Sequence, residues 1–263
     1  MGDDYGTAEV AREYGLLHIP HISKNEYGTP LLNSIFEQAQ EKSSYPLLCY
    51  VNTDIILLSD FAYALEMIRN SSQYFLVVGQ RYDLDVNELL KFNSGWEAKV
   101  RKHVNEKGVL HTHFGIDYFI FPRGFWGKIP PFAIGRTIWD NWLIYRARSL
   151  RADVIDVSAI VTIIHQNHDF NHVKDGESGA RTGPEAKRNL ELAGGYDKVF
   201  SLLDVNYILT QQGLEKPGSI EYIRRSQITW PILHPLLSLP KLVLLKVYII
   251  LSKLKCSLMN LNK

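Results

Sequence analysis

The sequence predicts an α/β fold in which a mostly parallel sheet is flanked by helices. Over residues 1–79, helical patterns alternate with short apolar runs in the order helix, strand, helix, strand, helix, strand. The run Leu47–Val51 is wholly apolar, which is typical of a strand buried on both faces of a parallel sheet. With 46% apolar and 22% charged residues among 263, the composition excludes a disordered or fibrous chain.

Local signals place each element along the chain. A helix over Thr7–Tyr14 ends at Gly15, and a short strand is expected over Leu16–Ile22. Thr29 and Pro30 suit the cap and the first position of a second helix, which runs to about residue 43. Further helices are predicted over 60–68, 96–104 and 137–148, and strands over 47–51, 74–79, 116–121, 154–157 and 160–164. The polar segment 166–185 predicts a mobile loop.

Charge is distributed unevenly along the chain. No acidic residue follows Glu221, so the formal net charge of +1 consists of −6 over residues 1–221 and +7 over residues 222–263. An acidic body excludes nucleic acid as its partner. With two cysteines and no signal-peptide pattern at the N-terminus, we expect a cytoplasmic protein.

The C-terminal segment differs from the body. The apolar run Leu242–Leu251 contains Lys246 and is shorter than the roughly 20 residues that a bilayer span needs. We therefore expect two domains, a body over 1–227 and a basic, apolar helical tail over 228–263. The tail either makes peripheral contact with the inner face of a membrane or packs on the body as an ordinary helix.

The segment Asn52-Thr53-Asp54 follows the apolar strand over 47–51 and carries the sharpest chemical signal. In open α/β sheets, ligands bind at the carboxyl ends of strands. A carboxylate placed there can hold a hard divalent cation that bridges to phosphates. The alternative is that Asp54 only caps the turn that follows the strand.

Three segments together resemble the family-2 glycosyltransferases of the GT-A fold. They are Asp3-Asp4 before Tyr5-Gly6-Thr7, the stretch from Asn25 to Gly28 with Asn33 downstream, and Asn52-Thr53-Asp54. Their order and spacing match the family over about residues 1–170. The resemblance implies that a nucleotide-diphosphate sugar is bound by Asp3, Asp4, Asn25, Gly28, Asn52, Asp54, Gly115 and Asp117.

The chain departs from the family pattern in two places. Asn52 stands where the family has the first aspartate of Asp-x-Asp, so only Asp54 keeps the charge. The family's first strand should precede Gly2, and we expect it to be missing from this chain.

Two residues of the second half match further family positions. The stretch Trp139-Asp140 with Leu143 and Arg146 looks like the family's Glu-Asp-x-x-Leu…Arg stretch, which implies that Asp140 is the general base. An adjacent indole desolvates a carboxyl group and raises its pKa toward that of a useful base. The alternative is that Asp140 only places a favourable negative charge in the first turn of a helix. The resemblance also implies that His165 joins Asp54 in binding Mg²⁺ or Mn²⁺, whereas an uninvolved surface histidine is the alternative.

The expected function is the transfer of a sugar, with inversion, to a hydroxyl of a saccharide or lipid-linked acceptor. Two alternatives stay open. Asn52 and the missing strand also fit an inactive nucleotide-sugar-binding or scaffold protein. A nucleotidyltransferase needs the same carboxylates and metal, but a Gly-rich basic phosphate loop is not visible in the sequence.

Overall fold

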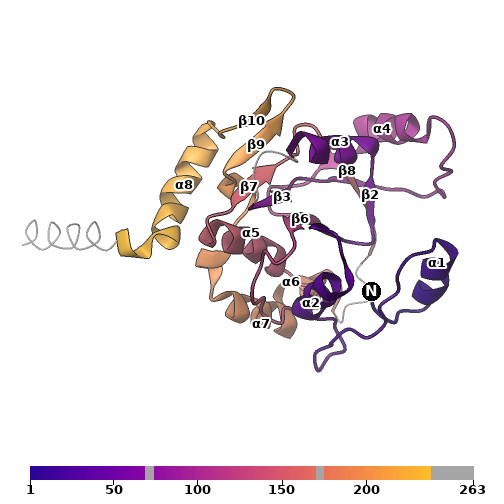
Figure 1. The fold of residues 1–263 in the computed structure, drawn as a ribbon, viewed down its shortest axis with the longest axis horizontal. Coiled ribbons are helices and arrows are strands. Elements are labelled where there is room, and N and C mark those ends of the chain that lie inside the picture. The colour runs from indigo at the N-terminus through magenta and orange to yellow at the C-terminus, as the bar shows by residue number, and fades with distance from the viewer. Residues whose placement is uncertain (69–73, 170–174, 238–263) are drawn as a thin grey trace, which may run out of the picture. The chain divides into compact units, whose positions relative to one another are not determined.

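The computed structural model describes residues 1–68, 74–169 and 175–237 (Figure 1). The chain divides into two units, Met1–Gly218 and Ser219–Lys263. The described part of the second unit contains the helix α8 (Ile220–Leu233). The domain border expected between residues 227 and 228 therefore falls within α8, and the run Leu242–Leu251 lies outside the described residues.

The first unit contains a six-stranded sheet with mixed strand directions. Its order is β1-β6-β3-β7-β9-β10. The strands are β1 (Leu47–Val51), β3 (Phe75–Val78), β6 (Tyr118–Pro122), β7 (Asp153–Asp156), β9 (Tyr207–Thr210) and β10 (Gly213–Glu215). Strands β3, β7 and β9 pair in parallel, whereas β6 is antiparallel to both β1 and β3, and β10 is antiparallel to β9.

The fold is therefore α/β, as predicted, but the expectation of a mostly parallel sheet is wrong. The long excursion between β3 and β6 returns the chain to the end of the sheet at which β3 finishes, so β6 runs antiparallel between β1 and β3. Either direction satisfies the backbone hydrogen bonds of a buried strand. Because β6 is antiparallel to both neighbours, β1, β3, β7 and β9 still run in one direction.

A second, four-stranded sheet continues from the first. Its order is β2-β8-β4-β5. The strands are β2 (Ile55–Leu57), β4 (Tyr82–Leu84), β5 (Val109–Leu110) and β8 (Ile163–Gln166). Three strands of the large sheet each lead within a few residues into a strand of the small one: β1 into β2, β3 into β4, and β7 into β8. We call these connections, residues 52–54, 79–81 and 157–162, the seam.

Seven described helices belong to this unit (Figure 1). They are α1 (Thr7–Glu13), α2 (Leu32–Lys42), α3 (Ser59–Ile68), α4 (Trp96–Lys107), α5 (Trp139–Ser149), α6 (Gly176–Thr182) and α7 (Pro184–Ala193), with 3₁₀ turns at Tyr196–Lys198 and Leu202–Asp204. Helix α5 contacts β3 and β7. Helix α3 packs in the core of the large sheet, and α4 packs against β4 and β8.

Burial separates the centre of the large sheet from its β1 edge. All four residues of β3 are buried, and Leu76 is fully so. In β1, by contrast, Leu47 and Val51 are each 37% exposed, so the prediction that this run is buried on both faces is wrong. A wholly apolar pattern cannot distinguish a central strand from the edge strand that β1 forms here.

Most predicted elements are confirmed within a few residues, but three predictions are wrong. Residues 16–22 form no strand, and Ile19 only accepts a hydrogen bond from the Gly2 N–H. The second helix starts at Leu32, because Pro30 and Leu31 bridge to other segments. In the segment 166–185, of which residues 170–174 are not described, α6 and the start of α7 replace the predicted loop.

No helix within residues 1–68, 74–169 and 175–237 combines the length and the apolar character that crossing a bilayer requires.

Candidate metal and proton-transfer site

A large cleft of about 1420 Å³ lies beside the seam in the first unit. Its wall includes polar residues of the N-terminal segment, the seam, the small sheet and the start of α5. Among the residues predicted to form the site, eight line it: Asp3, Asp4, Asn52, Asp54, Gly115, Asp117, Asp140 and His165. Asn25 and Gly28 do not line the cleft.

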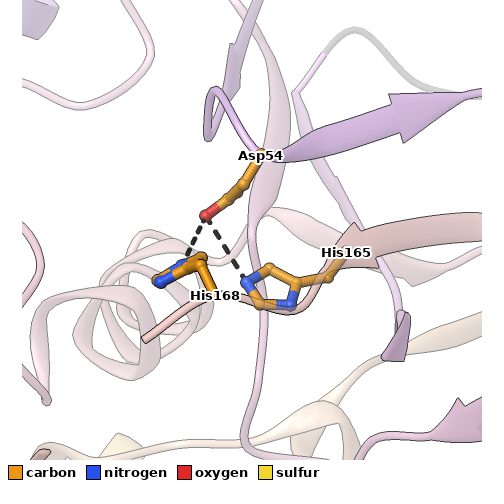
Figure 2. Close-up of side chains that lie close together, drawn as sticks. All are labelled: Asp54, His165 and His168. Carbon is orange, nitrogen blue, oxygen red and sulfur yellow. Dashed lines mark hydrogen bonds and ion pairs between the residues drawn. The ribbon is translucent and has the colours of Figure 1, made fainter. Parts of the chain in front are cut away.

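Asp54 and two histidines converge in this cleft (Figure 2). The Asp54 Oδ2 atom lies 3.4 Å from His165 Nε2 and 3.1 Å from His168 Nε2. One potential ligand atom from each of the three side chains lies within 4.8 Å of the others. The antiparallel pairing of β2 with β8 sets Ile55 opposite His165, which brings the preceding Asp54 to the end of β8.

The donor atoms of this cluster could hold a divalent cation. The second oxygen of Asp54, Oδ1, is shielded from solvent and has no hydrogen-bond partner in the described part of the chain. Burial alone would raise the pKa of Asp54, but the hydrogen bond and charge of His165, together with His168, bring it below its ordinary value. The carboxylate is therefore ionised at neutral pH, as a metal ligand must be.

His168 was not among the residues predicted from the sequence. The only local signal is its spacing from His165, with two residues between them. That spacing does not show that the chain turns after β8 so that both imidazoles approach one carboxylate. The sequence therefore identifies two of the three members of the cluster.

A charged network lies beside the cluster and joins the predicted residues Asn52 and Asp117 to Arg81, Asp83 and His111, which were not predicted. Asp83 Oδ2 lies 2.6 Å from His111 Nδ1, and Asp83 Oδ1 accepts a 2.9 Å hydrogen bond from Arg81 Nε. The Arg81 guanidinium also pairs with Asp117, and Asn52 Nδ2 donates to Asp117 Oδ1 at 2.7 Å. The amide nitrogen of Asn52 is therefore already hydrogen-bonded to Asp117.

This network holds Asp83 and Arg81 in their charged forms. Burial would raise the pKa of Asp83, but His111 and Arg81 lower it overall. Burial would lower the pKa of Arg81, but Asp117 and Asp83 raise it overall. A carboxylate and a guanidinium are thus kept ionised beside the metal-ligand cluster.

Asp140 lies in the first turn of α5, with its Oδ1 atom shielded from solvent and without a hydrogen bond from any described residue. Burial raises its pKa to about 7; the backbone N–H of Asn141 opposes this shift and the charge of Asp117 adds to it. The adjacent Trp139 is 4% exposed and packs against Tyr50. This carboxyl group can therefore exchange a proton near neutral pH.

The other predicted residues have local partners. Asn25 Oδ1 accepts hydrogen bonds from the N–H groups of Tyr27 and Thr29, closing a turn in which Gly28 has φ +80°. Asn25 Nδ2 donates to Glu185 at 2.6 Å. Asn25 and Gly28 therefore shape this turn. Their role in donor binding stays a prediction.

Asp3 and Gly115 also have local roles. Asp3 is exposed and pairs with Lys24 at 2.6 Å. Gly115 packs directly under the ring of His111, where a side chain would collide with the imidazole. Both residues line the cleft, so these contacts are compatible with a bound ligand.

Comparisons with known proteins assign no family to this chain. No family model, no curated protein and no solved structure matches it.

The raised pKa of Asp140 predicts a pH-dependent loss of stability. The folded protein keeps a proton on Asp140 up to about pH 7, whereas the unfolded chain releases it near its ordinary pKa of 3.8. The contribution of the Asp140 proton to the free energy of unfolding is therefore fully present below about pH 4 and is lost as the pH rises to about 7. Asp140→Asn removes this cost, so its stability gain over the wild type should be larger at pH 8 than at pH 5, by up to roughly 3 kcal/mol.

Urea unfolding at the two pH values measures this difference. Asp197→Asn, which neutralises an exposed aspartate outside the cleft, is the matched control and should shift stability equally at both. A pH-independent effect of Asp140→Asn would show that Asp140 is an ordinary aspartate.

Proposed function

We propose that this protein is a metal-dependent glycosyltransferase that moves a sugar from a nucleotide-diphosphate donor to an acceptor hydroxyl. The observation that carries the proposal is that one cleft contains both the Asp54–His165–His168 cluster and the shielded carboxyl group of Asp140. A metal-ligand set and a proton acceptor are the two components that such a transfer needs. The resemblance of residues 1–170 to family-2 glycosyltransferases supplies the reaction class.

The donor atoms favour Mn²⁺ over Mg²⁺. Two imidazole nitrogens and one carboxylate oxygen converge in the cluster. Mg²⁺ prefers oxygen ligands and water, whereas imidazole suits the transition metals. A cation held by Asp54, His165 and His168 would neutralise the negative charge that develops on the departing diphosphate.

The remaining polar residues of the wall are proposed to hold the donor. The side-chain oxygens of Asp3, Asp4 and Asp117 can accept hydrogen bonds, and the hydroxyls of a ribose or a sugar are suitable donors to them. Asn52 keeps its side-chain oxygen for the same purpose, because its amide nitrogen already bonds to Asp117. Glycine at position 115 leaves room for the ring of His111, which also lines the cleft.

Asp140 is proposed to remove the proton from the acceptor hydroxyl. A base works best when its pKa is near the working pH, and burial raises the pKa of Asp140 to about 7. The deprotonated oxygen then attacks the anomeric carbon from the face opposite the diphosphate, which inverts the configuration. The rate should rise with pH through about 7 as Asp140 becomes ionised.

Transfer from a panel of nucleotide-diphosphate sugars, with Mn²⁺ present, tests this function. Asp140→Asn should lower the transfer rate by at least ~100-fold, because the base is lost. Its affinity for the nucleotide diphosphate should be unchanged, and the exposed Asp197→Asn should behave as the wild type. A wild-type protein that neither turns over a donor nor binds any nucleotide diphosphate would overturn the proposal and favour a scaffold.

We also propose that the second unit binds an anionic membrane surface, which would bring the enzyme to a lipid-linked acceptor. In α8, Ile223 and Ile228 are exposed beside Arg224 and Arg225. With no acid after Glu221, the segment 222–263 has a charge of +7. Basic residues next to apolar side chains favour binding in the interface of an anionic bilayer.

Vesicle flotation tests the membrane proposal. The protein should float with vesicles that contain phosphatidylserine and stay behind with pure phosphatidylcholine. Replacing Lys246, Lys253 and Lys255 by Gln should lower the affinity for these vesicles on the order of 100-fold, because each basic residue near the surface contributes about 1 kcal/mol.

The matched control removes the same charge from the body. In α4, Lys99, Lys102 and Lys107 are exposed, and their replacement by Gln should leave flotation unchanged. Equal effects of the two triple variants would show that the tail has no special affinity for the bilayer.

A further inference from the structure

Asp83 lies on the opposite side of His165 from Asp54. The parallel pairing of β4 with β8 sets Asp83 directly across from His165. The antiparallel pairing of β2 with β8 sets Ile55, the residue after Asp54, across from the same histidine. Residues paired across neighbouring strands point to the same face of a sheet. Asp83 therefore shares a sheet face with His165, whereas Asp54, which precedes β2, is placed beside His165 by the distance of its carboxylate from Nε2.

The two ring nitrogens of His165 face different carboxylates. Nε2 lies 3.4 Å from Asp54 Oδ2, and Nδ1 lies 3.3 Å from Asp83 Oδ1. Nδ1 is shielded from solvent and makes no hydrogen bond within the described ranges, so Asp83 is the acceptor within its reach. An unpaired buried nitrogen costs free energy, and a small rotation of the ring toward Asp83 removes that cost.

Asp83 itself is held from two other directions. Arg81 Nε donates to Oδ1 at 2.9 Å, and His111 Nδ1 lies 2.6 Å from Oδ2. The backbone of His111 is fixed as well, because its N–H donates to the Arg81 carbonyl. The carboxylate of Asp83 is thus held rigidly as an acceptor. Only 23% of its side chain is exposed, which also limits its motion.

We propose that Asp83 is a positioning residue for the metal ligand His165. This inference rests on the metal site of the proposed function. Neutral imidazole carries one N–H and one lone pair, so an acceptor at Nδ1 fixes the proton there and leaves the lone pair on Nε2, facing Asp54. A carboxylate in this place also makes the ligating nitrogen more basic. Asp83 binds no metal; it selects the tautomer and the orientation of the histidine that does.

Mn²⁺ binding to the full chain, measured by electron paramagnetic resonance without any donor sugar, tests this role. Asp83→Ala should weaken Mn²⁺ binding 10- to 100-fold, the usual cost of losing such an acceptor. Couplings from ¹⁴N should fall from two imidazoles in the wild type to one in the variant. Asp83→Asn keeps an oxygen acceptor without the charge and should fall between the two in affinity.

Asp85→Asn is the matched control. It removes the same charge two residues further along, where Asp85 is exposed and contacts Asn167 rather than His165. It should bind Mn²⁺ as the wild type does. Thermal unfolding in a chelator checks that each variant is folded, and if Asp83→Ala is not, the shape-preserving Asp83→Asn decides.

Mn²⁺ affinities of the folded Asp83 variants within twofold of Asp85→Asn, with both ¹⁴N couplings retained, would overturn the inference. So would a wild-type protein that does not bind Mn²⁺. Because no donor sugar is used, the outcome is separate from that of the transfer assay. A protein that loses Mn²⁺ in Asp83→Ala but transfers no sugar would keep the inference and refute the proposed function.

Discussion

The pairing of β8 between β2 and β4 is the constraint on which the candidate site depends. Its register places His165 next to Asp54 on one side and across from Asp83 on the other. Strands β2, β4 and β8 each follow directly from a strand of the large sheet, so the buried core of that sheet fixes where the small sheet begins. A slip of one residue would turn His165 to the other face and separate the cluster.

The cleft keeps carboxyl groups in different protonation states by giving them different surroundings. The imidazoles of His165 and His168 lower the pKa of Asp54 despite its burial, whereas burial raises that of Asp140 to about 7. Arg81 pairs with both Asp83 and Asp117. Neighbouring carboxyl groups whose pKa values are pushed apart are typical of sites that divide ligand binding and proton transfer between them.

The sequence predicted most helices and strands, but it did not predict the directions and positions of the strands in the sheet. Apolar runs located β3 and β7, and helical patterns located α3, α4 and α5, because those signals are properties of contiguous residues. The direction of β6 depends on the path of a long connection, and the exposure of β1 depends on its place at the edge of the described sheet. Neither property is encoded within a single strand.

The same distinction applies to the site. Asp54 and His165, which the family resemblance joined, are 111 positions apart in the sequence and do approach each other. Asp83 was missed because β4 is only three residues long and lies in a polar stretch. His168 was missed because its position depends on the turn after β8. Short strands and turns acquire their geometry from tertiary pairing, which a local pattern cannot show.

The proposed chemistry requires that Asp54, His165 and His168 bind one metal ion. The most direct measurement is an anomalous difference map from crystals grown with Mn²⁺, collected near the manganese absorption edge. We predict a single strong peak in the cleft within coordination distance of Asp54, His165 Nε2 and His168 Nε2. A map with no peak between these side chains, in crystals whose protein is folded and fully exposed to Mn²⁺, would contradict it.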